Sequence, residues 1–278
     1  MKKLLLFLAA AVVACQPQAV PTVVRVSTTP DAPTLQVTAP TLTLLRAHDM
    51  ANLLQGCGYS ESGEELENPE VLNGFFGPTH YRLALMLLAV RQDDTLPLVY
   101  HVRGKSRFKN VVLPFAGTIT LTQLLEQPHY STQEVAIAQR EKWVLPDVNR
   151  ELYTAVGRFE LREQAGQRGA GVYRGTVAFD FGIAENGKPD YAWRTDRTAA
   201  HNIQLEYAGT WTSNATKRQI KVLWAKDLFN NPDVEALDIF TLGDRERTIN
   251  PKYAKLGWSD YWQNDEWWAN SPRPRLAL

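Results

Sequence analysis

The chain has 278 residues, of which 44% are hydrophobic and 22% are charged, as in an ordinary globular protein. Its 30 Lys and Arg balance its 30 Asp and Glu, which argues against a nucleic-acid-binding protein, because those normally carry a basic excess. Two cysteines are too few for a disulfide scaffold or a multi-cysteine zinc site.

The first fifteen residues have the pattern of an export signal. Two lysines precede an apolar run over residues 4–13. That run has the length of a signal-peptide core, whereas a membrane-spanning helix needs roughly 20 apolar residues. It ends in Val12-Val13-Ala14-Cys15, which resembles the lipobox of bacterial lipoproteins. The resemblance implies cleavage before Cys15, a diacylglyceryl thioether on its sulfur and acylation of the new amino terminus.

A lipidated Cys15 makes the membrane the first expected partner of this chain. Gln16 follows the cysteine where an Asp favours inner-membrane retention, so the resemblance implies the outer membrane, on either side. Cleavage leaves 28 basic and 30 acidic residues, a net charge of −2. It also leaves Cys57 as the one thiol, so no internal disulfide can form. The alternative is an ordinary cleaved signal with a chance cysteine.

The next segment predicts a tether. Residues 16–40 contain five Pro among many Thr and Val, a composition typical of an extended linker. The predicted organisation is therefore a signal peptide at 1–14, a lipid-anchored tether at 15–40 and a mostly-β domain at 41–278. The alternative for 22–26 is a first strand.

Residues 42–55 have helical spacing, and Gly56 should end that helix. Residues 73–78 form a turn-rich aromatic loop. Ser131 and Glu134 form a capping box ahead of a short helix. Apolar and alternating runs predict seven strands, which lie at about 80–90, 98–102, 113–121, 155–162, 172–181, 203–211 and 219–225.

Three of these strands contain the motif aromatic-x-Gly-Thr, with Gly117, Gly175 and Gly209 as the glycines. Such a glycine predicts a bulge or a sharp bend, and an aromatic ring can cover a bare glycine on a neighbouring strand. The fold class is therefore mostly β: a single antiparallel barrel or a two-sheet sandwich, with one or two short helices and an aromatic-rich C-terminal segment. The segment 207–211 resembles the Gly-x-Trp entry strand of lipocalin-like barrels.

Two surfaces are candidates for ligand binding. The first is a basic stripe of Arg103, Lys105 and Arg107, which alternate with uncharged residues and share one face if they lie on one strand. Such a stripe can hold an anion, or it is only the solvent face of a hairpin broken at Gly104. The second is an aromatic C-terminal segment that can stack on sugar rings or serve as core. Its members are Trp258, Tyr261, Trp262, Trp267 and Trp268.

The motifs of catalysis are weak in this chain. Glu65-x-Glu67-x-x-Glu70 only approximates the acidic motif of β-jelly-roll glycanases and is read as a solvated charge run. Cys57 follows a predicted helix C-terminus, where the helix dipole opposes a thiolate, so a small buried residue is expected. The five His residues show no ligand spacing, so neither a catalytic residue, a metal nor a cofactor is predicted.

The function expected from these features is that of a non-enzymatic binding or structural module of the cell envelope. Its possible partners are a glycan, a lipid or an outer-membrane protein, and no nucleic acid. Two alternatives stay open: an exported hydrolase of glycans or envelope polymers, and an accessory subunit of an outer-membrane complex.

Overall fold

A computed structural model describes residues 39–57, 69–145, 147–192, 200, 204–231, 234, 237–242, 247–263 and 265–270. The predicted signal peptide, Cys15 and the tether up to residue 38 lie outside these residues, as do Glu65 and Glu67. No helix in the described part is long and apolar enough to cross a bilayer.

The described part of the chain begins with helices α1 (Ala39–Ala47) and α2 (Ala51–Gln55), and α3 (Thr132–Glu141) separates two groups of strands. The strands are β1 (Leu72–Phe76), β2 (Tyr81–Gln92), β3 (Val99–Phe108), β4 (Val111–Glu126), β5 (Leu152–Glu163), β6 (Gly171–Ile183), β7 (Pro189–Tyr191), β8 (Leu205–Ser213) and β9 (Gln219–Ala225). Short elements follow: the 3-10 helix η1 (Leu228–Asn230), β10 (Phe240–Leu242), β11 (Arg247–Ile249), α5 (Pro251–Tyr253) and the π-helix η2 (Ala254–Trp258).

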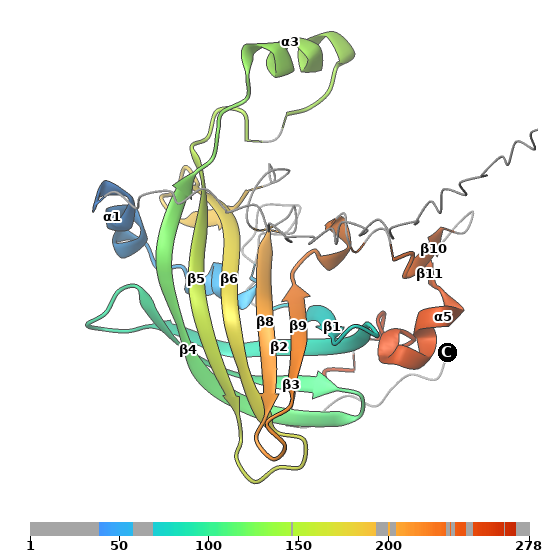
Figure 1. Cartoon of the computed structure of the whole chain (residues 1–278). Helices are drawn as coiled ribbons and strands as arrows, with labels where there is room; N and C mark the ends of the chain where they lie inside the picture. Colours follow the sequence, from blue (N-terminus) through green and yellow to red (C-terminus); the bar gives the residue numbers. More distant parts are fainter. Residues whose placement is uncertain are drawn as a thin grey trace, which may run out of the picture. The chain divides into compact units, whose positions relative to one another are not determined.

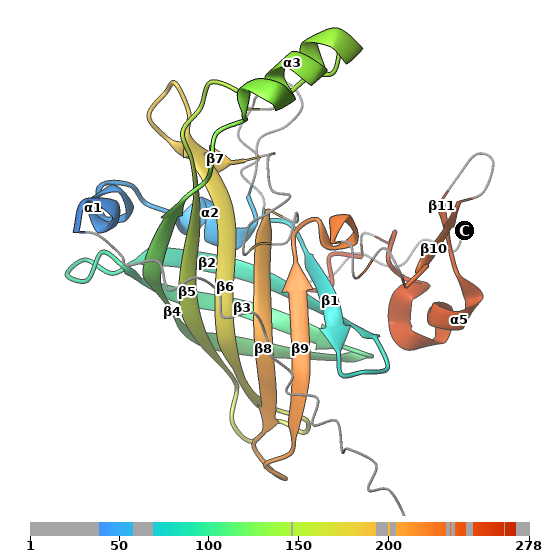
Figure 2. The same cartoon turned by 45° about the horizontal axis from the view of Figure 1, so that its top comes forward.

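Eight strands of the described chain close into an antiparallel barrel, so the barrel alternative of the sequence is confirmed (Figures 1 and 2). Each strand pairs with the next one along the chain, and β9 returns to pair with β1. Strand β7 is not one of the eight barrel strands. It pairs with the last residues of β6, which follow the part of β6 that pairs with β8. This up-and-down closure leaves the eight barrel strands without an open edge.

Alternation along each strand places one set of side chains inside the barrel. On β5, for example, Phe159 and Leu161 belong to the buried core, whereas Arg158 and Arg162, which precede and follow this pair, are exposed. The middle of the barrel is filled by aromatic rings. Trp224 stacks on Tyr207 with ring centroids 5.2 Å apart and meets Tyr173 and Phe159 edge to face.

Glycines allow strands to approach closely, but without the predicted bulges. The pairing register runs without a shift through Gly117, Gly175 and Gly209, so the prediction of a bulge at these positions is wrong. Gly175 and Gly209 face each other, and a Cβ on either would lie within 2.1 Å of a backbone oxygen. The predicted cover of a bare glycine is confirmed on β3, where the ring of Phe115 lies over Gly104.

Strand β1 corrects the prediction of a loop at 73–78. Phe75 and Phe76 belong to this strand, which pairs with both β2 and β9 and so closes the barrel. Gly74, which reads as a turn residue, lies where β1 and β9 come together. A Cβ there would be 1.9 Å from the carbonyl oxygen of Leu223.

The helix predicted over 42–55 is two helices. The Asp49 carboxylate accepts a hydrogen bond from the backbone N–H of Ala51 at 2.9 Å, which starts α2 anew. The backbone N–H of Met50 donates to the hydroxyl of Tyr100 instead of continuing the first helix. The predicted stop at Gly56 and the capping box at Ser131 are confirmed.

One end of the barrel is closed by α2. Met50 and Leu54 have no exposed surface and pack into the barrel core. The hydroxyl of Tyr207 donates to the carbonyl oxygen of Leu54 at 2.7 Å, and that of Tyr191 donates to the carbonyl oxygen of Leu53. Both helix carbonyls are thus satisfied inside the protein, so α2 fills this end as part of the core.

Candidate functional site

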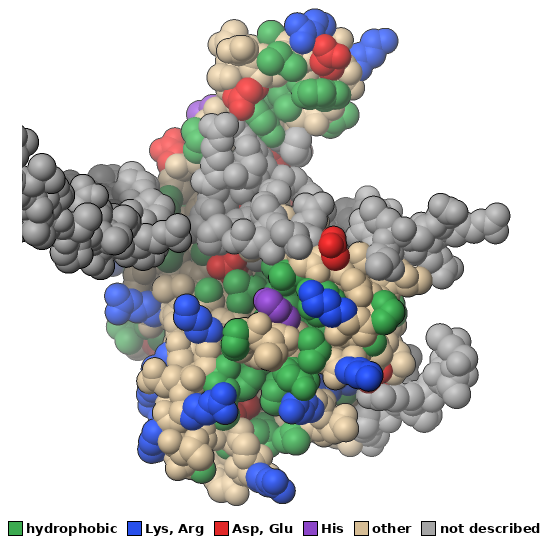
Figure 3. Space-filling view, turned by 45° about the vertical axis from the view of Figure 1, so that its right-hand side comes forward, with side chains coloured by type: hydrophobic (Ala, Val, Ile, Leu, Met, Phe, Trp, Pro, Cys, Tyr) green, Lys and Arg blue, Asp and Glu red, His purple; other side chains and the backbone are tan. Residues whose placement is uncertain are grey.

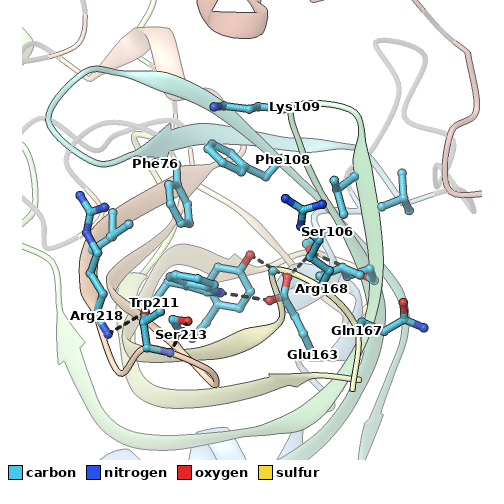
Figure 4. A pocket seen from close by; sticks show the side chains of 17 residues that line it. Phe76, Ser106, Phe108, Lys109, Glu163, Gln167, Arg168, Trp211, Ser213 and Arg218 are labelled. Carbon is cyan, nitrogen blue, oxygen red and sulfur yellow. Dashed lines mark hydrogen bonds between the residues drawn. The ribbon is translucent and has the colours of Figure 1, made fainter. Parts of the chain in front are cut away.

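The other end of the barrel contains a cavity of about 770 Å³ (Figure 4). Its lining comes from the strand ends and turns at that end of the barrel. The lining residues are Phe76, Ser106, Phe108, Lys109, Val111, Val112, Leu113, Glu163, Gln167, Arg168, Gly169, Tyr173, Trp211, Ser213, Thr216, Arg218 and Ile220. The cavity reaches solvent, because Val111 is 49% and Val112 37% exposed although both line it.

Part of the cavity wall is a cluster of aromatic rings. The ring of Phe76 lies between two others, at 4.2 Å from the ring of Phe108 and 5.2 Å from that of Trp211. Leu113 and Ile220 add aliphatic surface. Such a wall offers apolar contact to a ligand and few hydrogen bonds.

A buried carboxylate forms the inner end of the cavity. Glu163 is 5% exposed and has the same inward orientation as Leu161 on β5. One oxygen accepts hydrogen bonds from the hydroxyls of Ser106 at 2.6 Å and Tyr173 at 3.0 Å. The other accepts from the backbone N–H of Gly171 at 2.8 Å and from the indole N–H of Trp211 at 3.0 Å. Figure 4 shows the side-chain bonds as dashed lines.

These four donors come from three strands, so Glu163 links β5 to β3, β6 and β8 across the barrel. Burial and the adjacent carboxylate raise the pKa of Tyr173 well above its ordinary value. The phenol therefore keeps its proton and remains a donor. With four bonds the carboxylate has its acceptor sites filled, and this satisfies a charge that would be costly to bury alone.

The entrance of the cavity is basic. Lys109, Arg168 and Arg218 line it from the turns after β3, β5 and β8, and all three are exposed. The Lys109 ammonium lies 4.6 Å from the ring centroid of Tyr81, a cation–π contact. Neither Arg168 nor Arg218 forms an ion pair with a residue that the structure describes.

The predicted basic stripe lies on one strand and one face, as the alternation indicated, because Arg103, Lys105 and Arg107 all belong to β3 and point out of the barrel. Two of them hold the C-terminal segment. Arg107 pairs with Asp265 at 2.7 Å and Lys105 donates to the carbonyl oxygen of Trp268 at 2.6 Å. Arg103 is exposed.

The predicted aromatic segment packs mainly on the outside of the barrel. Trp258 has no exposed surface, lies against Phe75 and donates its indole N–H to the carbonyl oxygen of His80. Trp267 is 8% exposed and lies under the guanidinium of Arg107. Two of the five aromatics are thus buried in packing.

The remaining aromatics differ in exposure. Tyr261 and Trp268 are half-buried, and Trp262 is 60% exposed. The spacing of Trp258, Tyr261 and Trp262 in the sequence fits a helix, but Trp258 ends η2 and the other two lie in the turn that follows. Tyr261 contacts the rings of Phe229 and Phe240, and Trp262 contacts that of Phe240. Trp268 contacts Trp267 instead.

Sequence reasoning missed the cavity residues Glu163 and Arg168. An acidic residue at the end of a strand reads as solvent-facing. One signal was available, since Glu163 continues the inward series Phe159 and Leu161 at a spacing of two. Trp211 lies in the stretch that resembles a Gly-x-Trp strand, but nothing there pointed to a carboxylate partner.

Two further acidic residues and Cys57 have structural roles. Asp180, buried on β6, accepts hydrogen bonds from Thr154 and Gln127. Glu70 pairs with Lys226 at 2.7 Å. Cys57 is buried, as expected of a small core residue. In the described part of the chain, no three His, Cys, Asp or Glu side chains gather closely enough to hold a metal ion.

Comparisons with protein-family models, curated proteins and solved structures find no match to this chain. The function is therefore argued from the geometry of the barrel and its cavity.

Proposed function

We propose that the chain is an exported, lipid-anchored binding protein whose barrel holds a small, mainly apolar ligand in the cavity at its open end. The observation that carries this proposal is the cavity of about 770 Å³ with aromatic walls. Its volume lies within the range of about 300–1,000 Å³ that is typical of small-molecule sites. Apolar walls with a few fixed polar groups are also typical of such sites.

Binding fits this cavity better than hydrolysis. A glycosidase needs two carboxylates about 5–10 Å apart across the scissile bond. Among the lining residues, all of which the structure describes, Glu163 is the one acid, and four donors already occupy its oxygens. A carboxylate held in this way positions strands and walls rather than activating water.

A neutral fluorescent dye tests the site. N-phenylnaphthylamine should bind the purified chain with saturable fluorescence enhancement. Val111→Trp should abolish the enhancement, because Val111 lines the entrance and is exposed enough to accept an indole without disturbing the core. The matched control is Val148→Trp, at a comparably exposed valine outside the cavity lining.

Three results would overturn the assignment of this cavity. One is no saturable binding to the parent chain. Another is equal binding to the parent and Val111→Trp. The third is binding that survives Val111→Trp and is lost in Trp262→Ala, since this would move the site to the aromatic C-terminal segment, where Trp262 is exposed.

The second part of the proposal is the lipid anchor, which is supported by the resemblance of Val12-Val13-Ala14-Cys15 to a lipobox. In a bacterial host, Cys15→Ala should prevent incorporation of labelled fatty acid and move the protein from the membrane to the soluble fraction. Cys57→Ala is the matched control, because it removes the other cysteine and should leave the anchor intact. Unchanged lipidation of Cys15→Ala would contradict this part.

A further inference from the structure

We propose that the ligand class of this cavity is a single-chain amphiphile with an anionic head. The head, a carboxylate or a phosphate, lies between Arg168 and Arg218 at the entrance, and the alkyl tail lies inward between Phe108 and Trp211. This inference rests on the proposed binding function and adds the charge and the orientation of the ligand.

The charge argument begins at the entrance. The lining contains three cations and one carboxylate. Glu163 is directed inward, and its four hydrogen bonds come from uncharged donors, so it forms no ion pair with the arginines. Arg168 and Arg218 lie on different turns and form no ion pair with any described residue. Guanidinium groups bind carboxylates and phosphates through pairs of N–H donors.

The surface around the entrance is also positively charged. In Figure 3, Lys and Arg side chains prevail over Asp and Glu on the lower part of the face shown. In Figure 1 the turns after β5 and β8 also lie at the bottom of the barrel. Lys217 beside Arg218 is exposed as well. An approaching anion is therefore attracted to this end of the barrel.

The orientation follows from the two ends of the cavity. A negative head at the inner end would face the Glu163 carboxylate, and like charges in a buried site repel strongly. An uncharged alkyl tail that points inward is not repelled by this carboxylate, and it lies along the aromatic wall of Phe76, Phe108 and Trp211. Removing the tail from water there supplies affinity, while the arginines select the head.

Displacement of the neutral dye by ligands with the same tail tests this inference. Dodecanoate represents a free fatty acid, dodecyl phosphate represents a lipid phosphate, and dodecanol and dodecyltrimethylammonium are the neutral and cationic counterparts. All are used below the concentration at which they form micelles. At least one anion should displace the dye at about tenfold lower concentration than dodecanol, with the cation weakest. The anion that displaces the dye at the lower concentration shows whether the head is the carboxylate of a free fatty acid or a lipid phosphate.

The double variant Arg168→Glu/Arg218→Glu should weaken binding of the anions far more than binding of dodecanol, and so remove the preference for the anion. Arg103→Glu/Arg158→Glu changes the net charge equally at exposed positions outside the cavity lining, so it should keep the preference. Raising the ionic strength should reduce the preference of the parent chain for the anions over dodecanol, because salt screens exposed charges.

The outcomes separate this inference from the proposed function. If dodecanol and both anions displace the dye equally, the cavity binds ligands but the anionic head is wrong. A preference that survives Arg168→Glu/Arg218→Glu, or is lost equally in the control variant, also overturns the inference. If neither the dye nor any of the four ligands binds, the proposed function itself fails.

Discussion

The two ends of this barrel are finished in opposite ways. At one end, α2 inserts leucines into the core. The buried hydroxyl of Tyr100 accepts a hydrogen bond from the backbone N–H of Met50, and that of Tyr207 donates one to the carbonyl oxygen of Leu54. At the other end no helix of the described residues fills the space, and a carboxylate with four donors separates the core from an open cavity. One closed up-and-down sheet can therefore supply stability at one end and a binding site at the other.

The difference lies in what the inward positions hold. At the closed end Leu53 and Leu54 of α2 face the aliphatic and aromatic core. At the open end the inward series of β3 finishes with Ser106 and Phe108 and that of β5 with Glu163. Because the donors to the buried carboxylate come from three strands, hydrogen bonds hold the open end together in addition to ring packing.

The largest expected effect comes from the closed end. Leu54→Ala should lower the free energy of unfolding by about 3 kcal/mol, because a fully buried side chain leaves a cavity in the plug. Val111→Ala at the open end should change it by less than about 0.5 kcal/mol, because Val111 is half exposed. Urea denaturation measures both. Equal losses would contradict the contrast between the ends.

The second effect concerns the carboxylate of the open end. Glu163→Gln should lower the free energy of unfolding by roughly 2 kcal/mol, because an amide NH₂ would face donors such as the Trp211 indole and the Gly171 N–H. The control on the same strand is Glu160→Gln, which removes an outward-facing pair with Arg174 and should cost less than about 1 kcal/mol. If Glu163→Gln is no more harmful than this control, the four bonds do not support the open end.

The third effect is loss of stability in alkali. Burial raises the pKa of Tyr100 to about 12, and it raises those of Tyr173, Tyr191 and Tyr207 well above the ordinary value. The folded chain keeps these protons, whereas the unfolded chain loses them near pH 10. The free energy of unfolding therefore keeps its full value below about pH 10 and falls as the pH rises further. Each tyrosine contributes a slope of about 1.4 kcal/mol per pH unit.

The alkaline slope also distinguishes the two ends. Tyr191 and Tyr207 hold α2, whereas Tyr173 binds Glu163. The variant Tyr191→Phe/Tyr207→Phe should therefore reduce the slope about twice as much as Tyr173→Phe, measured by urea denaturation between pH 9 and 12. An unchanged slope in both variants would show that these phenols ionise freely in the folded chain.

Sequence patterns predicted much of the barrel wall and little of its ends. Apolar runs and alternation depend on neighbouring residues, so the seven predicted strands lie in seven of the eight barrel strands. Strand β1 was missed because Gly74 reads as a turn, and its real role is a close approach to Leu223 on β9, which is distant in sequence. Closure of a barrel is likewise a long-range property.

The candidate site was harder to predict for the same reason. Glu163 acquires its role only when Ser106 and Trp211, far away along the chain, come within hydrogen-bond distance. The C-terminal tryptophans illustrate the converse difficulty, since Trp258 and Trp262 look alike in sequence but are buried and exposed, respectively. Composition identifies aromatic residues, and only packing decides which of them cover a strand.

The central claim is that the open end of the barrel is the ligand site, and nuclear magnetic resonance can locate a ligand directly. The ligand for this measurement is a dodecanoate-like chain with a nitroxide at the end of its tail. It should broaden the indole N–H signal of Trp211 and the methyl signals of Ile220 more strongly than the methyl signals of Leu54 and the indole signal of Trp262. Broadening at Leu54 or Trp262 with a sharp Trp211 signal would contradict the account.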